Sequence, residues 1–146
     1  MKPRSCWAVL AKKAKDDEET AQDVHTQVRK KVEHLRGSRQ RMDDLLNDYK
    51  RRAIENQAKV HSMADTTNNR QFMLNLQELV NRVDKDLQVA LAELHRAKVA
   101  LMQATQQRMK METMQTKDME AVQQWQSKQD QKEMDSLGLT LYNLKA

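Results

Sequence analysis

The sequence contains very little of what compact globular folds and secreted proteins use. Its 146 residues include 2 glycines, 1 proline and 1 cysteine, and aromatic residues make up 3%. A β-sheet needs β-branched and aromatic strands joined by Gly, Asn or Pro turns, and this sequence has no such pattern. A single cysteine, Cys6, excludes an internal disulfide and a thiolate metal cluster, and it fits a reducing compartment.

Long apolar runs are missing as well. No stretch approaches the roughly 18 apolar residues that a membrane-spanning helix requires. The basic opening Met1-Lys2-Pro3-Arg4 leads into no signal-peptide core. We therefore expect a cytoplasmic chain.

The signatures of enzymes and cofactor sites are absent too. No Gly-rich phosphate loop is found, and the four histidines show no metal-ligand spacing, so we expect solvated imidazoles at His25, His34, His61 and His95. The acidic run Asp16-Asp17-Glu18-Glu19 is interpreted as a solvated face, because paired catalytic carboxylates need a desolvated cleft. We expect no catalytic residue, no metal, no cofactor and no small-molecule substrate.

What the sequence does contain is a long-helix composition. Charged residues make up 32% and the mean hydropathy is -0.95, with abundant Ala, Gln, Lys, Arg, Met and Leu, the mixture typical of coiled coils. The formal net charge of +5 is distributed in blocks: residues 1–15 carry 5 bases and no acid, and residues 16–23 carry 5 acids and no base.

Two periodic segments predict two helices. Apolar residues recur every seven positions from Trp7 to Tyr49, and Leu10, Val24 and Leu45 fit a second column of the seam. This second column drifts, because the apolar residues Val32, Leu46, Ala53 and Val60 lie one residue further along. Polar residues then crowd together, and Asn68 with Gln71 has the form of a helix-start capping pair. A cleaner repeat runs from Leu76 through Leu87 to Ala104 and weakens after Arg108, until Gly138 is expected to end the helix.

These segments predict an all-α fold, a long two-helix antiparallel coiled-coil hairpin with an overhanging C-terminal helix end. The hairpin forms a single domain over 1–146, with helix 1 at about 5–61, a turn at about 62–70, helix 2 at about 71–136 and a short C-terminal tail. With the turn centred at Thr66, facing residue numbers sum to about 132, so that Leu35 lies level with Ala97 and Trp7 with Trp125. Roughly the last 20 residues then extend beyond helix 1.

Several methionines allow two interpretations. Six of the ten fall in the last third, where the seam is weakest: Met102, Met109, Met111, Met114, Met119 and Met134. They either fill an imperfect core or adapt to a partner surface. Apolar residues away from the seam are further candidates for partner contact. They are Ile54, Phe72, Leu79, Leu91, Val99 and Met102.

Three segments resemble the FliJ family, small coiled-coil proteins of the bacterial flagellar export apparatus. They are Asp48-Tyr49-Lys50-Arg51, Asn69 to Leu76 with Gln71-Phe72, and Asp130-Gln131-Lys132-Glu133-Met134-Asp135. The segments fall at matching distances along nearly the whole chain, and the length is similar. The resemblance implies a hairpin like the stalk subunit of rotary ATP synthases, and a non-enzymatic escort protein for type III export in flagellar biogenesis and motility.

The same resemblance implies partners and their surfaces. The end that carries both termini would enter the hexameric export ATPase FliI, with Trp7, Met119, Trp125, Met134 and Leu137 as contact residues. The cytoplasmic domain of the export gate FlhA would bind near the turn. Its contact residues would be Met42, Leu45, Tyr49, Phe72, Leu76, Leu79 and Val83. FlgN-like and FliT-like export chaperones would also be bound, and the protein would be peripherally associated with the cytoplasmic face of the inner membrane.

Other functions remain open at this point. The stalk of a virulence type III secretion system shares the expected architecture. A prefoldin-like hairpin chaperone would also present apolar tips, but it needs a β-rich assembly segment. Basic blocks such as Arg29-Lys30-Lys31 and Lys50-Arg51-Arg52 allow nonspecific nucleic-acid binding, which we do not expect because aromatic residues are not interleaved with them.

Overall fold

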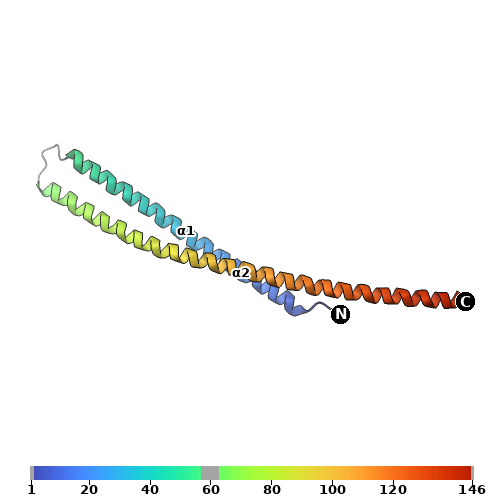
Figure 1. The fold of residues 1–146 in the computed structure, drawn as a ribbon. Helices are drawn as coiled ribbons and strands as arrows, with labels where there is room; N and C mark the ends of the chain where they lie inside the picture. The colour runs from blue at the N-terminus through green and yellow to red at the C-terminus, as the bar shows by residue number, and fades with distance from the viewer. Residues whose placement is uncertain (1, 57–62, 146) are drawn as a thin grey trace. The chain divides into compact units, whose positions relative to one another are not determined.

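The computed structural model describes residues 2–56 and 63–145. Two helices account for nearly all of them, α1 (Ser5–Asn56) and α2 (Met63–Lys145), and these ranges contain no strand (Figure 1). The predicted all-α hairpin is therefore confirmed. In neither helix does any stretch have the length and apolarity needed to cross a membrane.

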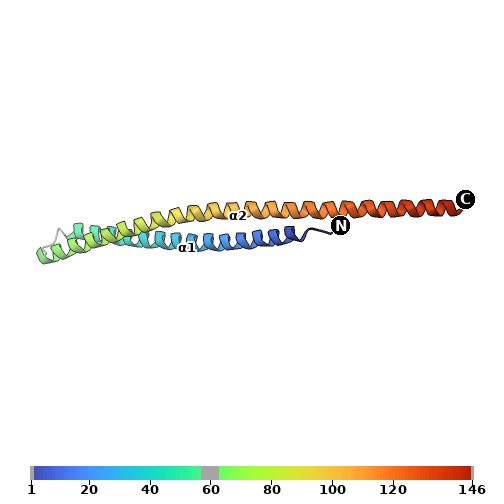
Figure 2. The same cartoon turned by 90° about the horizontal axis from the view of Figure 1, so that it is seen from below.

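The residues group into two packing units, and each contains part of both helices. The terminal unit consists of Met1–Ala21 and Leu101–Ala146, and the central unit is Gln22–Ala100. Within each unit α1 and α2 run side by side in opposite directions, as both views show (Figures 1 and 2). That the chain acts as a single domain stays a prediction.

The core of the central unit is a narrow seam. Val32 (1% exposed) packs with Leu87 and Ala90, and half-buried leucines at 35, 91 and 94 surround them. Fully burying a side chain such as Val32 contributes roughly 1.5–3 kcal/mol. The terminal unit has a thinner core, because its buried apolar residues are the small Ala11 and Ala14.

The predicted first column of the seam is confirmed. The second column was wrong at Leu10, Val24 and Leu45, whereas its shift by one residue at Val32, Leu46 and Ala53 is confirmed, and Val60 lies outside the described residues. Every seventh residue from Trp7 to Tyr49 is buried or half-buried. Leu10, Val24 and Leu45 are exposed instead, and the second column is shifted by one residue. It contains Ala11, Glu18, His25, Val32, Arg39, Leu46 and Ala53, all buried or half-buried.

Ion pairs between the helices explain two polar members of this column, Glu18 and Arg39. Arg108 Nε donates to Glu18 Oε2 at 2.6 Å and Arg108 Nη1 donates to Glu112 Oε2 at 2.8 Å. In the central unit Arg39 pairs with Asp84 in the same way. Charged side chains are accepted at half-buried seam positions when their hydrogen bonds are satisfied.

The predicted helix register was also wrong. The pairs Arg4–Asp118, Glu18–Arg108, Lys31–Glu93, Arg39–Asp84 and Tyr49–Phe72 have residue numbers that add to between 121 and 126, not 132. Trp7 therefore does not lie level with Trp125. The cause is that α2 begins at Met63 and not at about residue 71, so each residue of α1 faces a residue of α2 with a lower number than predicted.

Residues 63–70, predicted as part of a turn, belong to α2. The sequence has no Gly or Pro between Met63 and Leu137, and Asp65 in the first turn complements the helix dipole. Polar residues such as Asn68 lower helix propensity by only a few tenths of a kcal/mol each, too little to break the helix. Gln71 donates to Asn75 one turn on rather than acting as a cap. Helix α1 ends at Asn56, while 57–62, which include the predicted end of helix 1 and His61, lie outside the described residues.

Gly138 does not end α2, which continues to Lys145. A glycine ends a helix when it adopts a positive φ, and Gly138 does not adopt one. Inside a helix a glycine costs about 1 kcal/mol relative to alanine, and α2 nevertheless continues past Gly138 to Lys145. The predicted short tail after residue 136 is therefore helical as well.

The pairing of Glu18 predicts an acid-sensitive seam. The hydrogen bond from Arg108 lowers the pKa of Glu18 below its usual value of 4.5. A lowered carboxyl pKa stabilises the fold above that value, and this stability is lost as the pH falls through the folded-state pKa. We expect the wild type to melt at a higher temperature than Glu18→Gln at pH 7, and the difference to shrink below pH 4.5. A difference that stays constant down to pH 3 would contradict this assignment.

Candidate protein-binding surfaces

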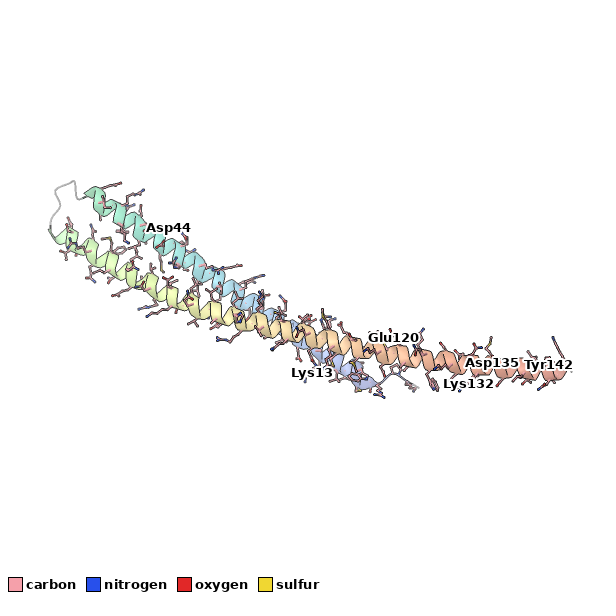
Figure 3. The ribbon with its side chains drawn as sticks, in the orientation of Figure 1. Lys13, Asp44, Glu120, Lys132, Asp135 and Tyr142 are labelled. Atoms are coloured by element: carbon pink, nitrogen blue, oxygen red, sulfur yellow. The ribbon has the colours of Figure 1, made fainter. Side chains whose placement is uncertain are left out.

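The C-terminal segment of α2 has no α1 segment beside it. The backbone N–H of Arg4, which directly precedes α1, donates to Asp118 Oδ2 at 2.6 Å, so Met119–Lys145 continue past the start of α1. This segment is roughly 40 Å long at 1.5 Å per residue. Lys132, Asp135 and Tyr142 project from it with no other part of the chain alongside (Figure 3). The predicted overhang is confirmed.

A row of apolar side chains runs along this segment. Met134, Leu137, Leu141 and Leu144 are all exposed and spaced three, four and three apart, the pattern of a coiled-coil seam. We call them the C-terminal apolar stripe. If the side of α2 that faces α1 is continued beyond Val122 at the same spacing, it includes positions 125, 129, 132 and 136. About the helix axis, the stripe is rotated from that side by about 150°. The stripe therefore does not extend the contact with α1.

The ATPase-contact residues predicted from the sequence lie mostly on the overhang. Met119, Trp125, Met134 and Leu137 are exposed there, whereas Trp7 is half-buried in the first seam column of α1. Sequence reasoning missed Leu139, Leu141, Tyr142 and Leu144, all exposed, because Gly138 was taken as the helix end. The three-four spacing beyond Met134 was the signal that would have found Leu141 and Leu144.

Four of the predicted gate-contact residues form a second surface, in the central unit. The rings of Tyr49 and Phe72 have centroids 4.5 Å apart and are tilted by 34°, which joins α1 to α2. Phe72 is 42% exposed, and Leu45 and Leu79 are also exposed. We call Leu45, Tyr49, Phe72 and Leu79 the aromatic surface. Large partly exposed apolar side chains grouped in this way are typical of protein-binding sites.

Charged residues border the aromatic surface. The Arg52 guanidinium lies 6.0 Å from the centroid of the Tyr49 ring. Asp48 pairs with both Arg51 and Arg52, at 2.6 and 3.1 Å. A cation over a ring and a shared carboxylate hold the Tyr49 side of the surface in place.

The remaining gate-contact residues lie deeper. Leu76 is 5% exposed, and Met42 and Val83 are half-buried in the seam. Because Leu76 packs between the helices, it cannot touch a partner while the hairpin is closed. Leu76 belongs to the apolar repeat of α2 because it is a core residue of this unit.

The other sequence candidates are scattered. Ile54, Val99 and Met102 are exposed, and Leu91 is half-buried. His34 and His95 are exposed as predicted, but His25 is half-buried in the seam, and its Nδ1 is buried with no hydrogen-bond partner among the described residues. In those residues no group of three or more His, Cys, Asp or Glu side chains is placed to hold a metal ion.

Comparison with known proteins assigns the chain to a family. No significant match was found among curated proteins or among solved structures. Residues 8–146 match the family described as flagellar FliJ protein, which confirms the resemblance seen in the sequence. Because this match covers nearly the whole chain, the chain belongs to the FliJ family, a non-catalytic component of the flagellar type III protein export apparatus.

Proposed function

We propose that this chain is the stalk and escort component that links the export ATPase FliI to the export gate FlhA and returns FlgN-like and FliT-like chaperones for new cargo. It has no enzymatic activity of its own and works at the cytoplasmic face of the inner membrane. Membership of a flagellar family favours this function over a virulence secretion stalk, a prefoldin-like chaperone or a nucleic-acid-binding protein.

The observation that carries the proposal is the overhang. A single helix about 10–12 Å wide with side chains fits a narrow central opening better than a pair of helices does. Its apolar stripe leaves the line of the α1 seam, so these side chains are available to another protein. Met134 and Leu137 contact the ATPase ring, and Leu141 and Leu144 extend this contact along the same stripe.

The aromatic surface supports the second half of the proposal. Phe72 and Tyr49 provide a rigid aromatic centre of the kind that dominates binding energy at protein interfaces. Leu45 and Leu79 extend the apolar area around it. The gate contacts these four residues directly, while Met42 and Val83 contribute only their accessible edges and Leu76 supports the surface from below.

Mixing the purified chain with the export ATPase tests the proposal. We expect the chain to raise the rate of ATP hydrolysis and the fraction of hexamer, because a helix that fills the opening is shared by several subunits. The measurements are phosphate release and analytical ultracentrifugation. Unchanged hydrolysis together with unchanged hexamer formation at saturating chain would contradict the proposal.

A further inference from the structure

A shallow apolar groove lies between α1 and α2 in the central unit. Its volume is about 330 Å³, and its lining residues are Leu46, Lys50, Arg70, Met73, Leu74 and Gln77. Leu46 is buried and Met73 half-buried, so these two form the floor, while Leu74 is 61% exposed at the side. None of the six belongs to the aromatic surface or to the C-terminal apolar stripe.

The groove opens on a different face from the aromatic surface. Successive residues of an α-helix are rotated by 100°. Lys50 therefore points about 100° away from Tyr49 on α1, and Leu74 points about 200° away from Phe72 on α2. A partner in the groove would leave the ring pair of Tyr49 and Phe72 accessible.

The charge at the groove is positive. Lys50 comes from α1 and Arg70 from α2, both are exposed, and neither forms an ion pair within the described part of the chain. The neighbouring Arg51 and Arg52 are already paired with Asp48. Among the described residues the lining contains no acidic side chain, so two cations without carboxylate partners in this part of the chain flank an apolar floor.

We propose that this groove binds an acidic amphipathic helix of a partner protein. One or two leucine-sized side chains of that helix occupy the apolar floor, and carboxylates on its flanks pair with Lys50 and Arg70. The volume lies at the small end of the range for ligand pockets, which suits side-chain anchors of a longer segment. An amphipathic helix in an apolar groove is a recurring mode of recognition. The inference does not depend on the proposed function, because neither of the other surfaces contributes to the groove.

A fluorescent peptide tests this inference on the full chain. The probe is a synthetic helix with leucines at i, i+4 and i+7 and glutamates on both sides, titrated by fluorescence anisotropy at about 0.15 M salt, where the Debye length is about 8 Å. We expect saturable binding that weakens about tenfold or more in Lys50→Glu/Arg70→Glu and in Leu74→Asp. A second peptide with lysine in place of glutamate should bind the double variant more tightly than the wild type.

Matched controls distinguish peptide binding in the groove from a nonspecific effect of the chain's positive charge. Arg82→Glu/Lys85→Glu reverses two exposed bases of α2 that do not line the groove, and Leu79→Asp alters the aromatic surface. Both should change peptide affinity less than about twofold, since distant exposed charges are screened by salt. Circular dichroism melting should show that every variant remains folded, because none of these side chains is buried.

Three results would overturn the inference. The first is equal weakening by the control pair and the groove pair. The second is binding that depends on Leu79 rather than on Leu74. The third is sedimentation with phosphatidylglycerol vesicles that requires Lys50 and Arg70, together with no peptide binding up to about 1 mM, an affinity worth only about 4 kcal/mol. That last result would assign the groove to a lipid surface.

Discussion

Truncation after Trp125 should abolish stimulation of the export ATPase and leave binding to the gate unchanged. The deletion removes the whole C-terminal apolar stripe, all four members of which are exposed. It keeps Asp118, which accepts the hydrogen bond from Arg4, and every residue of the buried core. We expect the affinity for the ATPase to fall about tenfold or more, since burying four large apolar side chains contributes several kcal/mol.

Point variants test the same expectation without shortening the chain. Leu137→Asp/Leu141→Asp should reproduce the loss, whereas Lys132→Ala/Asp135→Ala, which changes two polar residues of the same segment, should retain stimulation (Figure 3). Binding can be followed by surface plasmon resonance and hydrolysis by phosphate release. Full stimulation by the truncated chain would rule out the overhang as the ATPase-binding element.

Phe72→Asp should reduce gate binding about tenfold or more without unfolding the protein. Phe72 is 42% exposed, so a carboxylate at this position remains solvated. The substitution removes the ring that contacts Tyr49 and places a charge at the centre of the apolar surface. Binding to the purified cytoplasmic domain of the gate, measured by calorimetry, gives the affinity, and ATPase stimulation should remain at the wild-type rate.

Two neighbouring residues serve as matched controls for Phe72. Leu74→Asp introduces the same charge two residues further along α2, on the groove side, and should not affect gate binding. Leu76→Asp places the charge in the seam at a residue that is 5% exposed, so it should lower the melting temperature and impair both activities. If Phe72→Asp and Leu74→Asp weakened gate binding equally, the aromatic surface would not be the gate contact.

The seam shows which parts of the fold could be predicted from the sequence. The seven-residue repeat from Trp7 to Tyr49 is apolar throughout, and it identified one column of α1 correctly. The second column includes Glu18, His25 and Arg39, which a search for apolar residues passes over. Only the position of Arg108 and Asp84 across the seam shows that Glu18 and Arg39 belong there.

The helix ends were predicted less accurately, because local propensity was given too much weight. Thr66 to Asn69 have the composition of a turn, yet the chain around them has no Gly or Pro and stays helical. Gly138 looked like a helix end, but it adopts no positive φ and α2 continues past it to Lys145. Both errors had consequences, since the first shifted the register and the second hid half of the C-terminal apolar stripe.

Of the candidate sites too, some residues could be predicted from the sequence and others could not. Phe72 and Leu79 could be selected because they are apolar and lie outside the repeat, whereas Met134 was named as a contact because the family resemblance implied it. The groove could not, because it depends on the side-by-side placement of Lys50 and Arg70, which are 20 residues apart in sequence. A register error of several residues is enough to separate such a pair in any sequence-based arrangement.

Site-specific photo-crosslinking tests most directly the claim that one chain holds the ATPase and the gate through separate surfaces. A photoreactive phenylalanine analogue would replace Tyr142 in one preparation and Phe72 in another, and each would be mixed with the ATPase and the gate domain together. We predict that position 142 crosslinks to the ATPase and position 72 to the gate domain. A crosslink from position 142 to the gate domain or back to the chain itself would contradict the account.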